Sequence, residues 1–197
     1  MKKYFLAFVI LLSFSADGAP LPSQKGQVVL PSKESSVEFV AIGRPTALKI
    51  RGKGGIPEGS FFIQKNEVTG SVEVILENFD TGIGLRNEHM RKKYLEIEKF
   101  PKAKLEVKKM ILPPSFWREE NTSFKEVAYE GVLSLHGVSR SVQGVFELEK
   151  RADHISVQAS FTLKLSDFGI MTPNFKGITV AQDVQVIVSF LAPLKKI

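Results

Sequence analysis

Hydrophobic and polar residues alternate with a period of two along most of this chain. In the longest run every second residue from Ile155 to Leu165 is apolar, and the residues between them are polar. Successive side chains of a β-strand point to opposite faces, so this pattern predicts a strand with one buried and one exposed face. The pattern recurs in seven other segments, which begin near residues 37, 48, 68, 103, 127, 142 and 184. Eight such segments joined by short turns predict an all-β protein with an antiparallel sheet.

One stretch departs from this alternation of apolar and polar residues. Leu85–Ile97 carries Met90, Tyr94 and Ile97 at the spacing i, i+4, i+7, which is typical of a short amphipathic helix. Pro101 biases the residue before it away from helical geometry and so limits the helix on its C-terminal side. The pattern therefore predicts an eight-stranded antiparallel, lipocalin-like β-barrel with one short helix that caps a mouth of the barrel.

Short turns are predicted to join three consecutive strands, which begin near residues 127, 142 and 155, into a meander. His136-Gly137 suits a two-residue hairpin, because Gly adopts positive φ without steric cost and His does so more readily than most residues. Lys150–Asp153 supplies the next turn. Upstream of these strands, Pro113-Pro114 followed by Phe116-Trp117 predicts a loop that packs aromatic side chains against the barrel.

The first residues have the order of a secretory signal peptide. Two lysines precede an apolar run over residues 4–14, and small residues follow it. This order predicts a signal peptide at residues 1–19 and export to the periplasm, with an uncleaved membrane anchor or a buried N-terminal strand as the alternative. The rest of the chain is divided into an extended segment at 20–35 with a short strand at Gln27–Leu30, a barrel domain at 36–191 and a C-terminal tail at 192–197.

The composition restricts the chemistry of the protein. The 197 residues include no Cys, which excludes disulfides, thiolate metal sites and thiol nucleophiles. There are three histidines, His89, His136 and His154, and no Gly-x-Ser-x-Gly motif accompanies them. We therefore expect no catalytic residue, no metal and no cofactor. A hydrolase that uses His89 is the least favoured alternative.

Positive charge is concentrated in one stretch of the chain. Between Arg91 and Lys109, eight basic residues stand against three acidic ones, and this excess of five equals that of the whole chain after residue 18. Such a stretch can contact a lipid pyrophosphate or an anionic membrane surface, and a solvated face of helix and strand is the alternative. Nucleic acid is not an expected partner, because the chain is predicted to be exported and aromatic residues are not interleaved with the basic ones.

Four short motifs follow one another along the chain: Thr81–Met90, Phe100–Leu105, Gly131–Arg140 and Asp167–Ile170. Together they resemble, in order, the motifs of the YceI family of bacterial polyisoprenoid-binding proteins. Thr81–Met90 resembles the family's Thr-then-Arg-Asp-x-His-Leu pattern, and Phe100–Leu105 resembles its aromatic-Pro-x-Ala stretch. Gly131–Arg140 resembles its Gly-x-Leu-x-Leu-Asn-Gly-Val-Thr-Lys hairpin. Asp167–Ile170 resembles the stretch that follows the family's long penultimate strand.

The chain also departs from the family pattern. His136 replaces the usual Asn of the hairpin, and Asn87 stands where the family usually has Asp. Arg91–Leu95 is basic where the family has small, acidic and aromatic residues, and Arg51–Gly59 is unusually rich in glycine. We expect these departures to affect the ligand more than the fold.

The resemblance implies a barrel that encloses an isoprenoid tail, such as that of a quinone or a polyprenyl lipid. On this interpretation the protein is a periplasmic carrier rather than an enzyme, and it holds its ligand by burying apolar groups. The resemblance also allows a homodimer. A secreted module with a solid core, which binds a protein or a glycan, is the alternative.

Two sets of residues are predicted to hold such a ligand. The tail is expected to lie against ten inward-facing residues: Phe39, Val72, Val74, Leu133, Phe146, Val157, Phe161, Leu163, Val186 and Phe190. A polar head group is expected at the mouth, near five further residues: Arg86, His89, Met90, Tyr94 and Trp117.

Overall fold

The computed structural model of the chain describes residues 25–30, 34–44, 48–175 and 177–193. The predicted signal peptide at 1–19 and the residues that directly follow it lie outside this part of the chain. The strands are β1 (Lys25–Leu30), β2 (Ser36–Arg44), β3 (Leu48–Lys53), β4 (Glu58–Gln64), β5 (Glu67–Ile75), β6 (Lys102–Ile111), β7 (Thr122–Leu135), β8 (Val138–Lys150), β9 (His154–Lys164), β10 (Asn174–Phe175) and β11 (Ile178–Pro193). The helical segments are η1 (Leu76–Asn78), α1 (Gly84–His89), η2 (Met90–Tyr94), α2 (Ser115–Arg118) and η3 (Leu165–Phe168).

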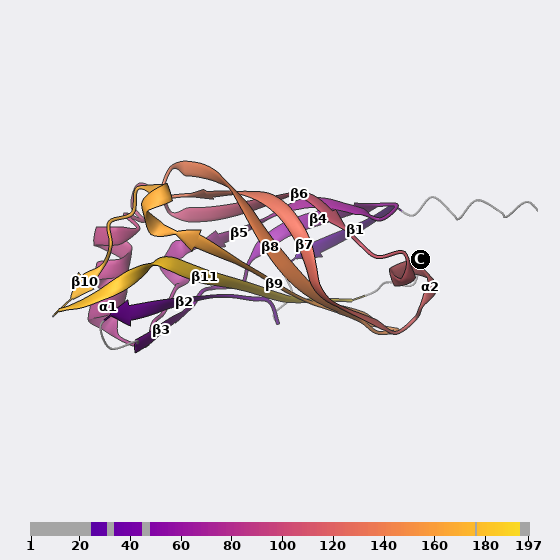
Figure 1. Cartoon of the computed structure of the whole chain (residues 1–197), viewed down its shortest axis with the longest axis horizontal. Helices are drawn as coiled ribbons and strands as arrows, with labels where there is room; N and C mark the ends of the chain where they lie inside the picture. Colours follow the sequence, from indigo (N-terminus) through magenta and orange to yellow (C-terminus); the bar gives the residue numbers. More distant parts are fainter. Residues whose placement is uncertain (1–24, 31–33, 45–47, 176, 194–197) are drawn as a thin grey trace, which may run out of the picture.

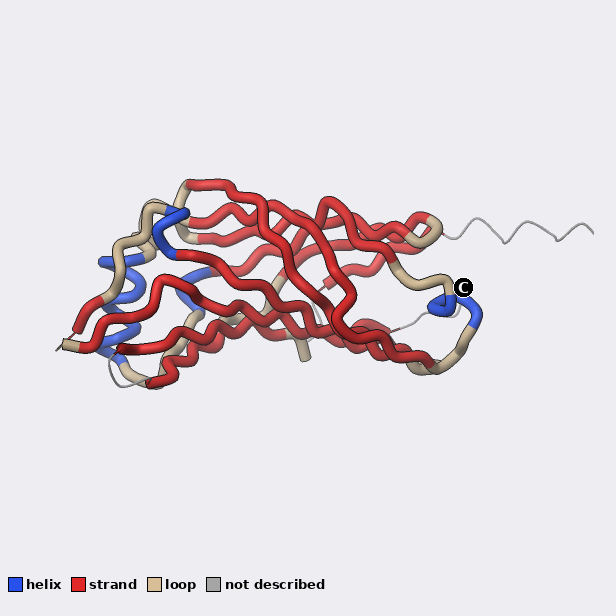
Figure 2. The backbone as a smooth tube through the Cα atoms, viewed as in Figure 1, coloured by secondary structure: helices blue, strands red, loops and turns tan. Residues whose placement is uncertain are grey.

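One antiparallel sheet contains all the strands of the described residues. Its order is β1-β4-β5-β6-β7-β8-β9-β11-β2-β3, and β10 pairs with β11. The sheet curls about the long axis of the molecule, with α1 and β10 at one end and α2 at the other (Figures 1 and 2). Within the described part of the chain, β1 and β3 are the two edges of the sheet, so its hydrogen-bonded ladder is not closed into a ring.

The predicted all-β, antiparallel, barrel-like fold is confirmed, but the predicted number of eight strands is wrong. The described residues form eleven, and the three additional ones are β1, β4 and β10. Strand β1 includes the short strand expected at Gln27–Leu30. The alternation of apolar and polar residues does not reveal β4, because Phe61, Phe62 and Ile63 form a continuous apolar run. It does not reveal β10 because that strand is too short to show a period. Strand β11 continues to Pro193, which lies within the predicted tail.

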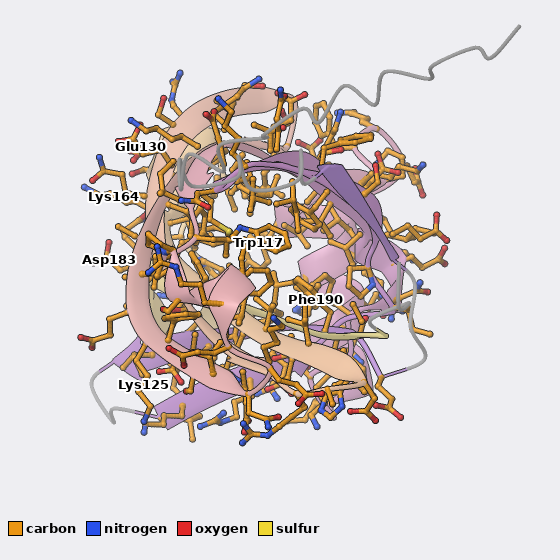
Figure 3. The ribbon with its side chains drawn as sticks, turned by 90° about the vertical axis from the view of Figure 1, so that its right-hand side faces the viewer. Trp117, Lys125, Glu130, Lys164, Asp183 and Phe190 are labelled. Atoms are coloured by element: carbon orange, nitrogen blue, oxygen red, sulfur yellow. The ribbon has the colours of Figure 1, made fainter. Side chains whose placement is uncertain are left out.

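Alternation along the strands decides which side chains enter the barrel. Along β9, Ile155, Val157, Phe161 and Leu163 are all buried. Viewed from the α2 end, Phe190 lies toward the middle of the molecule, whereas other labelled side chains extend outward (Figure 3): Lys125, Glu130, Lys164 and Asp183. The predicted meander is present as β7, β8 and β9. His136 and Gly137 adopt φ values of 52° and 74°, as the two-residue hairpin requires.

The predicted helix at Leu85–Ile97 forms, but it ends three residues early. It consists of α1 followed by η2, whose last turn is closed by a 2.8 Å bond from the Leu95 amide to the Met90 carbonyl. This spacing of five residues is that of a π-helix. Glu96 then adopts a positive φ of 45°, and a right-handed helix cannot continue through a residue in that conformation. None of the helices in the described ranges is long and apolar enough to cross a bilayer.

At the opposite end, α2 forms where the sequence predicted an aromatic loop. Phe116 of this short turn is buried, and its ring packs edge-on against Trp117 with 4.7 Å between the ring centroids. The Lys150 ammonium lies 4.9 Å above the Phe116 ring and donates hydrogen bonds to the Phe116 and Glu119 carbonyls. This end of the barrel is therefore filled by aromatic rings.

Candidate functional site

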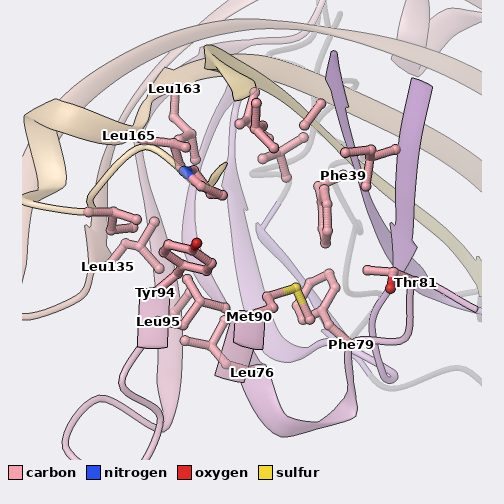
Figure 4. A pocket seen from close by; sticks show the side chains of 18 of the residues that line it. Phe39, Leu76, Phe79, Thr81, Met90, Tyr94, Leu95, Leu135, Leu163 and Leu165 are labelled. Atoms are coloured by element: carbon pink, nitrogen blue, oxygen red, sulfur yellow. The ribbon is translucent and has the colours of Figure 1, made fainter. Parts of the chain in front are cut away.

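A cavity of about 430 Å³ occupies the half of the barrel next to α1. Strands β2, β3, β5, β6, β7, β9 and β11 contribute side chains to its wall, and α1 and η2 lie across its end. The wall is almost entirely apolar, with Phe39, Phe79, Met90 and Leu163 among the side chains around the space (Figure 4). Such a cavity suits an apolar ligand, because any polar ligand atom placed inside would lose its hydration without gaining hydrogen bonds.

A second, smaller cavity of about 70 Å³ lies in the half of the barrel next to α2. Its wall is apolar, and it shares Val72, Leu105 and Val188 with the larger cavity. The rings of Phe61 and Phe190 stack within its wall, with 5.9 Å between their centroids. The interior is therefore open toward α1 and nearly solid toward α2.

The structure divides the ten predicted tail-lining residues between the two cavities. Seven of them line the larger cavity: Phe39, Val72, Val74, Leu133, Phe161, Leu163 and Val186. The other three, Phe146, Val157 and Phe190, line the smaller one. All ten line one of the two cavities, but alternation carries no information on which half of the barrel is hollow.

Four of the five predicted mouth residues, Arg86, His89, Met90 and Tyr94, line the larger cavity near α1. The assignment of Trp117 to this mouth is wrong. Its indole Nε1 donates hydrogen bonds to the Lys65 carbonyl at 3.0 Å and to Asn66 Oδ1 at 3.1 Å, at the turn between β4 and β5. The ten residues of β6 separate α1 from Trp117, and a strand of that length spans about 33 Å.

Glycines make room for two of the aromatic rings in the cavity wall. Phe39 pairs across the sheet with Gly52, where a Cβ atom would lie 2.2 Å from the Phe39 ring. A Cβ atom on Gly54 would lie 2.7 Å from the ring of Phe79. The two rings meet at 5.6 Å between centroids. The two rings thus pack directly against the glycine-rich stretch that departs from the family pattern.

A hydrogen-bond network fixes the start of α1 to the residues that directly precede it. Arg86 Nε donates to Thr81 Oγ1 at 2.8 Å, and the Thr81 hydroxyl and amide both donate to Asn87 Oδ1. Asn87 Nδ2 in turn donates to Asp80 Oδ1 at 2.6 Å. The hydrogen bond from Asn87, with one from the Gly82 amide and the nearby Arg91 charge, holds the pKa of the Asp80 carboxyl below its usual value. The Thr-Arg-Asn motif therefore positions the helix, and Arg86 makes these contacts within the motif.

The end of the capping helix is tied to the barrel through His136. Its Nδ1 lies 3.0 Å from the Phe168 carbonyl, and its Nε2 lies 2.9 Å from Glu96 Oε2. A neutral imidazole can donate only one of these bonds, whereas the protonated ring donates both. Hydrogen bonds from Lys99 and then His136 lower the pKa of the Glu96 carboxyl. His136, which replaces the family's usual Asn, thus joins the turn that follows η2, the β7–β8 turn and η3.

The basic stretch from Arg91 to Lys109 does not form a single site. It runs from the capping helix along most of β6, so that its two ends lie toward opposite ends of the barrel. Five of its lysines contact carboxylates, at N–O distances of 2.6 to 3.5 Å: Lys92, Lys99, Lys102, Lys104 and Lys108. The portion near the mouth consists of Arg91, Lys92 and Lys93, of which Arg91 donates to the Phe79 carbonyl at 3.0 Å.

Sequence reasoning missed several residues of the cavity wall. Leu76, Phe79 and Ile83 lie between β5 and α1, outside any strand, so alternation could not identify them. The described residues contain no group of three His, Cys, Asp or Glu side chains placed to hold a metal ion. What the arrangement can do is bury an apolar chain beneath a helix whose polar residues lie at the opening.

Comparison with known proteins agrees with this geometry. A sequence model described as the YceI-like domain matches residues 29–192. A structure described as a polyisoprenoid binding domain from Saccharophagus degradans implicated in plant cell wall breakdown is similar, with a TM-score of 0.67, 17% identity, and coverage of 86% of this chain and 98% of that one. Burkholderia cenocepacia BcnA is similar with a TM-score of 0.65 and 16% identity, over 81% of this chain and 96% of that one. A Campylobacter jejuni YCEI protein is similar with a TM-score of 0.51 and 15% identity, over 100% of both chains. No curated protein matches the sequence.

Proposed function

The chain belongs to the YceI-like domain family, and we propose that it binds the tail of an isoprenoid lipid in the larger cavity. The observation that carries the proposal is an apolar cavity of about 430 Å³ under a helix. The likeness of the fold to a polyisoprenoid binding domain supports an isoprenoid over other apolar chains. Arg86 and His89, at the mouth, are the residues we propose for contact with a polar head group.

Burial alone can supply the affinity. Each buried CH₂ group contributes about 0.8 kcal/mol, so ten such groups contribute about 8 kcal/mol. That energy corresponds to a dissociation constant of about 1 μM before the entropy of confining the chain is subtracted. Binding therefore needs no special polar contact, and chain length is expected to govern affinity more than the head group.

We propose that the protein acts as a carrier in the periplasm and that the ligand leaves chemically unchanged. The signal-peptide pattern at residues 1–19 supports export. A quinone and a polyprenyl lipid both present the same isoprenoid tail, so the head group separates them. A module that binds a protein or a glycan would need no cavity of this size, which disfavours that alternative.

Native mass spectrometry of the purified protein, followed by organic extraction, tests the proposal. We expect a mass above that of the polypeptide and an isoprenoid in the extract. A protein that is bare as purified, and still bare after incubation with ubiquinone and undecaprenyl phosphate, would contradict the proposal and favour a binding module for another partner.

Two substitutions of the same kind make the test specific to the site. Ala41 is buried in the wall of the larger cavity, and Ala192 is buried in the wall of the smaller one. Ala41→Phe is expected to fill the ligand space and lower lipid occupancy, whereas Ala192→Phe is expected to leave it unchanged. Each insertion costs about 1–3 kcal/mol of stability, so circular dichroism must first show that both variants are folded. Equal occupancy in the two variants would place the ligand elsewhere.

A further inference from the structure

We propose that the mouth end of the barrel docks on an anionic lipid bilayer. The inference rests on the proposed function, because a ligand with an isoprenoid tail resides in a membrane and must enter the cavity from it. It adds the surface through which the transfer occurs. The observations that carry it are an exposed apolar rim around the opening and a basic helix beside that rim.

The entrance rim consists of four large apolar side chains that are about half exposed. Leu48, Ile83 and Leu85 line the larger cavity, yet they are exposed by 47%, 53% and 51%. Met171, exposed by 62%, lies in the short segment between Ile170 and Pro173, both of which line the cavity. Four of the nine large apolar side chains that are exposed among the described residues thus gather at one opening. Clustered exposure of this kind marks an interaction surface.

The charge beside the rim selects the partner. The segment formed by α1 and η2 carries Arg86, Arg91, Lys92 and Lys93 against the single acidic Glu88. On β3, Lys49 and Arg51 are exposed on the outer face, on either side of the buried Ile50. An apolar rim flanked by basic residues is the pattern of a surface that inserts between lipids while its lysines and arginines contact anionic head groups.

The same charges disfavour a second copy of the chain as the occupant. Two barrels that met mouth to mouth would bring like charges together, and a symmetric interface places each patch against itself. A bilayer also gives the ligand a continuous apolar path from the lipid tails, past Leu85, into the cavity.

Flotation with vesicles tests the inference, using variants outside the cavity wall. The mouth variants are Met171→Ser and the pair Lys92→Gln with Lys93→Gln. Their matched controls at the opposite end of the barrel are Ile111→Ser, at a residue exposed by 45%, and Lys108→Gln with Lys109→Gln. Each lysine pair loses one ion pair with a glutamate, and the mouth pair also loses the contact of the Lys93 ammonium with the Tyr94 ring, 5.4 Å from its centroid. The vesicles contain phosphatidylglycerol and phosphatidylethanolamine, or phosphatidylcholine alone.

We expect the wild-type protein to float with the anionic vesicles and not with phosphatidylcholine. Removal of the two mouth lysines should weaken binding by about tenfold or more, and Met171→Ser should weaken it severalfold. The controls should bind as the wild type does, and salt at about 1 M should release the protein. Absence of wild-type binding, or equal losses at both ends of the barrel, would overturn the inference. So would a mouth variant that changed the oligomeric state in sedimentation while vesicle binding persisted.

Binding of a detergent-solubilised isoprenoid, measured on the same variants, separates this inference from the proposed function. Loss of flotation with retained isoprenoid binding supports docking as a distinct step. A wild-type protein that floats but binds no isoprenoid contradicts the proposed function and leaves the membrane surface standing on its own.

Discussion

The hydroxyl of Tyr129 gives a sharp test of how the barrel interior is assembled. Tyr129 is 2% exposed in β7, and its ring lies over Gly144 of the adjacent strand. Its hydroxyl is buried and has no hydrogen-bond partner in the described part of the chain. A buried hydroxyl without a partner costs about 1–3 kcal/mol of desolvation, and removing one oxygen forfeits only a few weak contacts. Tyr129→Phe is therefore expected to stabilise the protein by about 1 kcal/mol, or about 2–4 °C in Tm.

Tyr94→Phe is the matched control, because its hydroxyl is partnered. It donates to the Asn174 carbonyl at 3.4 Å and accepts from the Asn174 amide at 3.3 Å. Loss of these bonds is expected to destabilise the protein by about 0.5–1.5 kcal/mol. Urea unfolding of both variants at neutral pH, with unchanged m-values, gives the comparison. Destabilisation of Tyr129→Phe to the same extent as Tyr94→Phe would refute the reasoning, since it would mean that the Tyr129 hydroxyl is satisfied by a bound water.

The pH dependence of Tyr129→Phe supplies a second readout. Burial raises the pKa of the Tyr129 phenol. Below the ordinary tyrosine pKa of about 10 the phenol is neutral in both the folded and the unfolded chain. Above that value the unfolded chain releases the proton more readily, so the free energy of unfolding falls as the pH rises. The fall should be smaller in Tyr129→Phe, and equal slopes for variant and wild type would argue against a buried phenol.

Three further outcomes are expected. Hydrogen bonds from Lys99 and then His136 lower the pKa of the Glu96 carboxyl. The stability that the ionised Glu96 contributes should therefore be present at neutral pH and be lost as the pH falls through that lowered pKa. NMR titration of Glu96 should show a pKa below that of a free glutamate. Gly144→Ala should destabilise the barrel by about 1–3 kcal/mol in urea unfolding, since a Cβ atom there would lie 2.4 Å from the Ser160 carbonyl oxygen. A stability close to that of the wild type would mean that the strands separate easily. Fluorescence of Trp117, the single tryptophan, should report unfolding but change little on ligand binding, and strong quenching by ligand would place the ligand at the α2 end.

The path of the backbone was largely predictable from local patterns. Alternation is a local signal with a period of two, so it identified strands such as β9 and β11 and the faces that they bury. The His136-Gly137 turn was predictable because its residue types tolerate positive φ. The same signal failed for β4, where consecutive apolar residues hide the period, although only Phe61 of the Phe61-Phe62 pair is buried.

The position of the site was less predictable, because it depends on which residues share one end of the barrel. Trp117 and the capping helix are near in sequence, yet β6 carries the chain from one end of the barrel to the other between them. For the same reason the basic stretch from Arg91 to Lys109 is concentrated in sequence and spread out in space.

The sequence by itself determined the fold class, the direction in which each regular strand faces, and the presence of a helix at one mouth. These depend on residue type and spacing within a few positions. Only the tertiary structure decided that the interior is hollow next to α1 and nearly filled next to α2, and that Gly52 and Gly54 make room for Phe39 and Phe79. Hollowness depends on how side chains from many strands fill a shared volume, and no local pattern in the sequence encodes that sum.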